Sequence, residues 1–195
     1  MQISFVLDAI LQLKPGSILD IGCGSGKYGV LLREYLPKAR IDGIEGFSPY
    51  ITSVHRTVYD NIYEANALEF VAQMRHGYNL SIMIDVFEHL DPTDGERLLG
   101  LLRTRSNSVL ISVPVCHPRQ EAIHGNVLQE HRAQYNAAML RRLGFGQILR
   151  VSGNYIALSG PTTIRLRSKA LKCAVTALLP GWANQALAPI SRRIH

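Results

Sequence analysis

A glycine-rich stretch near the N-terminus, Asp20–Gly29, has the residue types and spacing of a ligand-binding loop. Gly22, Gly24 and Gly26 stand at every second position, where the backbone can turn sharply and a ligand can approach without meeting a Cβ atom. An apolar run precedes the stretch and a helical pattern follows it, so the loop is predicted to connect a buried strand to a helix. The free N–H groups and partial positive charge of a helix start favour a polar or anionic ligand there.

Two common nucleotide-binding loops fit this stretch poorly or only in part. A phosphate-binding P-loop requires glycine five positions before a Gly-Lys pair and Ser or Thr after it, but Ile21 and Tyr28 occupy these positions. A dinucleotide fingerprint that starts at the strand end would place its third glycine at Lys27. A fingerprint from Gly24 to Gly29 does fit, although it lies two residues too deep in the turn. A nicotinamide-binding domain therefore stays open as an alternative.

The stretch closely resembles the cofactor motif of class I S-adenosylmethionine-dependent methyltransferases. In that family an acid ends the first strand and Gly-x-Gly-x-Gly follows, as Asp20 and the three alternating glycines do here. The resemblance implies that S-adenosylmethionine binds along the ends of the first four strands. The cofactor-binding residues that it implies are Asp20, Gly22, Cys23, Gly24, Gly26, Glu45, Gly46, Asn66, Ala67, Asp85 and Val86.

Two of these residues have specific implied roles. Glu45 ends the second predicted strand, where a carboxylate would accept hydrogen bonds from both ribose hydroxyls. Asn66 follows the third strand, where the family usually has an aspartate that accepts from the adenine amino group. An amide can accept there and can also donate to a ring nitrogen, but Asn66 fits equally well as the N-cap of the next helix.

The string Asp85–Leu90 resembles the Asp-x-x-Glu-His stretch that follows the fourth strand in small-molecule members of the family. The resemblance places Asp85 beside the ammonium group of the cofactor and the acceptor substrate. Some members bind a divalent metal through Glu-x-x-Glu-His and another histidine. Here the first acid is the shorter Asp85, so a hydrogen-bonded Glu88–His89 pair without metal is expected. The alternative is a metal site on Glu88 and His89, completed by one further histidine: His117, His124 or His131.

A long segment that contains these three histidines separates the fifth predicted strand from the next helix. Long loops beside a cofactor cleft usually cover the substrate. Methyl transfer to oxygen requires a deprotonated acceptor, and an imidazole can take that proton near neutral pH. His131 and His124 are therefore candidate general bases, with Asp85 as the third candidate catalytic residue.

The pattern of elements predicts a doubly wound α/β fold, because strand-like and helical segments alternate five times. Strands are expected at residues 18–21, 40–45, 61–65, 80–85 and 108–113, followed by a hairpin of residues 147–151 and 154–158. Helices are expected at residues 2–13, 26–35, 48–57, 68–75 and 131–143, with one more that begins at Pro92. This order resembles the Rossmann-like methyltransferase fold, a mostly parallel seven-stranded sheet with an antiparallel last strand and helices on both faces.

The resemblance spans about residues 17–160, which implies a methyltransferase domain, residues 1–160, and a basic extension, residues 161–195. All 15 acidic residues lie at or before Glu130, whereas Lys and Arg continue to the end, and the net charge is +6. The extension has an amphipathic helical pattern, which predicts peripheral contact with an anionic membrane, packing on the domain or oligomer formation. It lacks interleaved aromatic residues, so nucleic acid is not expected as a partner.

Three cysteines without a C-x-x-C pair and no signal-peptide pattern predict a cytoplasmic protein that could associate with a membrane. The expected activity is methyl transfer from S-adenosylmethionine to oxygen of a small-molecule, sugar or lipid-linked acceptor. The alternatives are a tRNA or rRNA methyltransferase and a non-catalytic cofactor-binding scaffold protein.

Overall fold

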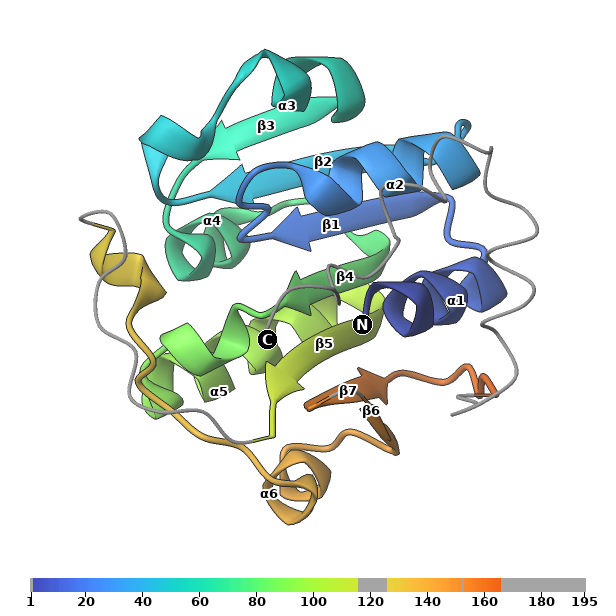
Figure 1. Ribbon diagram of the computed structural model, residues 1–195, viewed down its shortest axis with the longest axis vertical. Helices are drawn as coiled ribbons and strands as arrows, with labels where there is room; N and C mark the ends of the chain where they lie inside the picture. The colour runs from blue at the N-terminus through green and yellow to red at the C-terminus, as the bar shows by residue number, and fades with distance from the viewer. Residues whose placement is uncertain (1, 116–125, 152, 166–195) are drawn as a thin grey trace, which may run out of the picture.

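The computed structural model of the chain describes residues 2–115, 126–151 and 153–165. One seven-stranded sheet in the order β3-β2-β1-β4-β5-β7-β6 forms its centre (Figure 1). The strands are β1 (Ser17–Ile21), β2 (Arg40–Glu45), β3 (Asn61–Glu64), β4 (Tyr78–Ile84), β5 (Ser106–Pro114), β6 (Gln147–Val151) and β7 (Asn154–Ser159).

The first five strands are parallel to one another, and β7 lies antiparallel between β5 and β6. Gly153 has a φ of 84° in the connection between β6 and β7, a conformation that glycine adopts readily. The predicted mostly parallel seven-stranded sheet with an antiparallel last strand is therefore confirmed.

Helices cover both faces of the sheet, and alternate residues of each central strand supply the two cores. Along β1, Ile18 joins the core with α1, α2 and α3, whereas Leu19 joins the core with α4, α5 and α6. Because both faces of the central strands are covered, their sequences are almost continuously apolar. The helices are α1 (Ile3–Leu13), α2 (Lys27–Tyr35), α3 (Ser53–Val58), α4 (Ala67–Gln73), α5 (Pro92–Arg105) and α6 (Ala137–Arg142), with short 3₁₀ helices η1 (Ser48–Tyr50), η2 (Phe87–His89) and η3 (Val127–Gln129).

Two predicted helices are wrong in extent. The helix expected at residues 48–57 is two pieces, η1 and α3, because Thr52 has an extended backbone and caps α3 instead of continuing η1. The helix expected at residues 131–143 is only α6. The backbone N–H groups of Arg132 and Ala133 donate to the carbonyl oxygen of Glu88 at 2.9 and 3.0 Å, which holds this part of the chain outside the helix. The side chain of Asn136 then caps α6 by accepting from the N–H of Met139 at 3.0 Å.

The basic extension is described only through Arg165, and the predictions for residues 166–195 lie outside the described residues. The described part stays attached to the domain, since Ile164 is buried and its N–H donates to the side chain of Gln147 at 3.0 Å. Among the described helices, none combines the length and apolar character needed to cross a membrane.

Candidate active site

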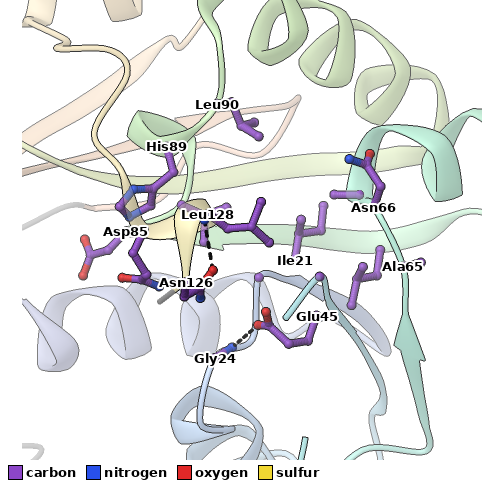
Figure 2. A pocket seen from close by; sticks show the side chains of 16 residues that line it. Ile21, Gly24, Glu45, Ala65, Asn66, Asp85, His89, Leu90, Asn126 and Leu128 are labelled. Atoms are coloured by element: carbon purple, nitrogen blue, oxygen red, sulfur yellow. Dashed lines mark hydrogen bonds between the residues drawn. The ribbon is translucent and has the colours of Figure 1, made fainter. Parts of the chain in front are cut away.

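A pocket lies where β1, β2, β3 and β4 end, at the edge of the sheet where ligands of doubly wound folds bind (Figure 2). Its lining comes from the four strand ends, from the segment after β4 and from η3. The lining residues are Ile21, Gly22, Gly24, Ile44, Glu45, Gly46, Ala65, Asn66, Ala67, Asp85, Val86, His89, Leu90, Asn126, Leu128 and Gln129.

The glycine loop after β1 depends on backbone conformations and contacts that a side chain would disturb. Gly22 has a φ of 67°, and a Cβ atom there would stand 2.6 Å from a methyl carbon of Val86. Gly24 has a φ of 56° and nothing lies within 4 Å of the place where its Cβ would be. The loop therefore presents bare backbone to open space in the pocket, as a cradle for a close ligand requires.

Glu45 ties the glycine loop to the end of β2. One carboxylate oxygen accepts from the N–H of Gly24 at 2.8 Å, and the other accepts from the N–H of Phe47 at 2.8 Å. The residue is only 6% exposed but lines the pocket. Because each carboxylate oxygen has a further lone pair, both can still accept a hydrogen bond from a ligand hydroxyl.

Two residues that the sequence analysis did not identify, His55 and Tyr59, also hold the glycine loop in place. His55 is fully buried, and its Nε2 atom lies 2.9 Å from the carbonyl oxygen of Gly24. Its Nδ1 atom accepts from the N–H of Thr52 at 3.1 Å, so the proton belongs on Nε2, which donates to Gly24. Tyr59 donates its hydroxyl to Asp20 at 2.6 Å and accepts from the N–H of Gly29 at 3.1 Å.

Three predicted cofactor residues, Asp20, Cys23 and Gly26, lie in or under the loop but do not line the pocket. Asp20 is 2% exposed. The pKa of Asp20 is raised to about 7, mainly by burial and also by the charge of Glu45, while the hydrogen bond from Tyr59 opposes both. Asp20 therefore acts in this structure as an anchor for the loop, through Tyr59.

Asn66 caps α4, because its side-chain oxygen accepts from the N–H groups of Leu68 and Glu69 at 2.9 and 3.2 Å. The predicted N-cap is confirmed. With the oxygen used in this way, the amide nitrogen of Asn66 is the group that can donate to a ligand in the pocket. Ala65 and Ala67 beside it give this end of the pocket a small apolar surface.

Asp85 stands at the opposite end of the pocket in a left-handed backbone conformation with a φ of 56°. Its carboxylate accepts hydrogen bonds from Gln2, from Ser112 at 3.2 Å and from Asn154 at 3.1 Å. These donors come from the start of α1, from β5 and from β7, so three elements distant in sequence fix one side chain. Burial raises the pKa of Asp85, and the donated hydrogen bonds counteract this. A non-glycine residue held in this conformation by several partners is common at functional sites.

Glu88, His89 and His131 form a cluster beside Asp85. Each of the three residues offers one atom that could bind a metal ion. These three atoms lie within 4.8 Å of one another, as a shared metal ion would require. The rings of His89 and His131 are 4.8 Å apart between centroids. Of the three histidines that could complete the alternative metal site, the structure brings His131 to this place. His117 and His124 lie outside the described residues, so the prediction of His124 as a general base stays open.

The protonation of this cluster follows from its burial. Glu88 is 1% exposed, and one of its carboxylate oxygens has no hydrogen-bond partner within the part of the chain that the structure describes. The pKa of Glu88 is raised to about 8, mainly by burial and also by the charge of Asp85. Burial lowers the pKa of His89, as does the neighbouring His131. The Nδ1 atom of His89 lies 3.0 Å from the carbonyl oxygen of Glu130 and donates to it, so the neutral ring carries its lone pair on Nε2.

Comparison with known proteins yields similarity in structure only. No protein-family model and no curated protein matches the sequence. The structure is similar to an O-methyltransferase family protein from Burkholderia thailandensis (TM-score 0.61, 12% identity, 82% of this chain and 56% of that chain). It is also similar to a putative O-methyltransferase from Nostoc punctiforme (TM-score 0.60, 17% identity, 80% and 54%). A SAM-dependent methyltransferase from Archaeoglobus fulgidus matches over more of its own length (TM-score 0.60, 17% identity, 80% and 91%).

This chain thus spans just over half of the first two proteins. The similarity establishes the fold. In this fold a buried carboxylate, bare glycine backbone and small apolar residues line one pocket. The chain has the Rossmann-like methyltransferase fold.

Proposed function

We propose that the protein is an S-adenosylmethionine-dependent methyltransferase that acts on oxygen of a small-molecule, sugar or lipid-linked acceptor. The observation that carries this proposal is Glu45, a buried carboxylate at the end of β2 that lines the pocket and has acceptor capacity left on both oxygens. A parallel-sheet carboxylate in this place is suited to a ribose. Two of the structurally similar proteins are named as O-methyltransferases, which supports oxygen as the acceptor atom.

The residues of this chain would divide the binding of the cofactor among them. Gly22 and Gly24 provide backbone that can be approached closely, Glu45 would accept from the ribose hydroxyls, and Asn66 would donate to the purine. Asp85, at the other end, would attract the ammonium group of the methionine part. Bound S-adenosylmethionine supplies a methyl group on a positively charged sulfur atom.

The acceptor would bind beside Asp85 and His89, because these residues line the end of the pocket away from Asn66 (Figure 2). His89 can accept a proton there. Its lowered pKa favours the neutral ring, and the Nε2 atom of that ring carries the lone pair. His131 stands next to His89 and could share this proton. Alignment of acceptor and donor in one pocket contributes about 7–11 kcal/mol in well-oriented reactions.

We propose as the alternative a divalent metal ion on Glu88, His89 and His131, in which case the Nε2 atom of His89 binds the cation and does not act as the base. The buried carboxylate oxygen of Glu88 without a partner among the described residues favours a cation at this place. A bound cation would lower the pKa of an acceptor hydroxyl. If the metal is required, EDTA abolishes activity and added Mg²⁺ or Mn²⁺ restores it. Unchanged activity after EDTA treatment would exclude the metal and leave His89 as the base.

A transfer assay tests the function itself. The protein is incubated with methyl-labelled S-adenosylmethionine and fractions of a cell extract, beside an Asp85→Asn variant. We expect label in a small-molecule or lipid fraction and a loss of about tenfold or more in the variant. Label in the RNA fraction would instead support the tRNA or rRNA alternative. A protein that binds the cofactor but labels no fraction would support the scaffold alternative.

A further inference from the structure

Leu128 is a large apolar side chain that lies exposed inside the pocket. The described large hydrophobic residues that are exposed are Val30, Val54, Leu128 and Met139, and of these only Leu128 lines the pocket. It is 46% exposed. Figure 2 shows it between the side of the pocket formed by Asp85 and His89 and the side formed by Ala65 and Asn66. A leucine in this place has apolar surface that a ligand would cover.

The position of Leu128 is fixed by a tight turn and by a close contact with the end of β2. The side chain of Asn126, which is 1% exposed, accepts from the N–H of Leu128 at 2.9 Å. The carbonyl oxygen of Asn126 accepts from the N–H of Gln129 at 3.1 Å. A Cβ atom on Gly46 would stand only 2.9 Å from Cδ1 of Leu128, so the absence of a side chain at Gly46 permits this approach.

Leu128 therefore lies directly beside Gly46, which follows Glu45. If Glu45 holds the ribose, the base attached to that ribose extends past this contact toward the apolar part of the pocket. The apolar side chains among the pocket lining include Ile44, Ala65, Ala67, Val86 and Leu90. A purine is flat and largely apolar on its faces, so an apolar lining suits it. Leu128 would add the exposed apolar surface of η3 to the surface that the strand ends provide.

We propose that Leu128 is a cofactor-binding residue that packs on the purine ring of the methyl donor. This proposal rests on the proposed function. It adds a cofactor-binding residue from η3, a segment outside the strand ends. Burial of the exposed part of the leucine against the ring would strengthen binding of the nucleoside half of the cofactor. It would leave the contacts of the methionine half unchanged.

Calorimetric titration of the full chain with two ligands tests this proposal. S-adenosylmethionine contains both halves of the cofactor, whereas 5′-methylthioadenosine contains only the nucleoside half. For Leu128→Ala we expect both dissociation constants to rise by a similar factor of about five to ten. Leu128→Gln, which keeps the size but not the apolar surface, should show the same loss, and Leu128→Met should bind like the unmodified protein. The matched control is Met139→Ala, since Met139 is 39% exposed on α6 and does not line the pocket.

The outcomes separate this proposal from the proposed function. Binding by Leu128→Ala and Leu128→Gln at the affinity of the unmodified protein, or more tightly, overturns the role of Leu128 while the methyltransferase proposal stands. A loss for S-adenosylmethionine without a loss for 5′-methylthioadenosine also overturns it, because the purine would then not be the group in contact. Failure of the unmodified protein to bind either ligand overturns both proposals.

Discussion

Tyr59 connects the glycine loop to the strand beneath it. Its hydroxyl donates to Asp20 and accepts from the N–H of Gly29, and all three groups are withdrawn from solvent. Tyr28, in α2 next to Gly29, presents a contrast. Its hydroxyl is buried and has no hydrogen-bond partner within the described ranges of the chain. The hydroxyl groups of these two buried tyrosines therefore contribute differently to the fold.

Tyr59→Phe is expected to lower the free energy of unfolding by about 1–3 kcal/mol, because it leaves two buried polar groups without a partner. Tyr28→Phe, the matched control, removes an unpaired hydroxyl and should leave the free energy of unfolding unchanged or raise it. Urea unfolding followed by circular dichroism measures both changes. Equal losses in the two variants would contradict the assigned role of Tyr59.

Asp20 gives the domain a pH-dependent stability. Its pKa is raised from 3.8 to about 7 in the folded protein, mainly by burial. The folded chain therefore keeps a proton that the unfolded chain releases, and the free energy of unfolding falls as pH rises from about 4 to 7. In Asp20→Asn this part of the slope disappears. Urea unfolding at a series of pH values provides the comparison, and a stability that rises equally in both proteins over this range would refute the assignment.

Among the elements, α4 begins at a residue with two roles in this account, one observed and one proposed. Asn66 caps the helix with its side-chain oxygen, and its amide nitrogen is the group proposed to donate to the cofactor. Aspartate is as good an N-cap as asparagine but carries no amide donor. The two roles can therefore be separated by substitution.

We expect Asn66→Ala to lower the free energy of unfolding by about 1 kcal/mol and Asn66→Asp to keep it. Both variants should bind S-adenosylmethionine several-fold more weakly, because both lose the donor to the purine. Thermal unfolding and titration calorimetry on the same preparations measure the two effects. Affinity like that of the unmodified protein in Asn66→Asp would show that Asn66 is only a helix cap.

The extents of two elements show where local sequence patterns were insufficient. Ser48-Pro49 correctly indicated a helix start, but the stretch ends after one turn, because Thr52 and His55 begin a new helix with a capping box. The pattern from His131 onward is helical in spacing, yet Arg132 and Ala133 bond to the carbonyl oxygen of Glu88 instead. Both interruptions serve the site, since they bring His55 under the glycine loop and His131 beside His89.

For the whole molecule, the sequence predicted the sheet correctly, and it identified strand-end residues that line the pocket. Glu45, Asn66 and Asp85 follow separate parallel strands, whose carboxyl ends must meet at one edge of the sheet. His55, Tyr59 and Leu128 were not predicted. Their roles depend on contacts between segments far apart in the chain, which have no local pattern. Glu45 and Gly24 show the same dependence, since the hydrogen bond between them exists only once β1 and β2 are paired.

The central claim is that the pocket at the ends of β1–β4 binds S-adenosylmethionine, and direct titration tests it. The full chain is titrated in a calorimeter with S-adenosylmethionine and, separately, with NAD, beside a Glu45→Gln variant that weakens the acceptor for ribose hydroxyls. The account predicts saturable binding of S-adenosylmethionine, binding about tenfold weaker in Glu45→Gln, and no binding of NAD. Binding of NAD without binding of S-adenosylmethionine would contradict the account.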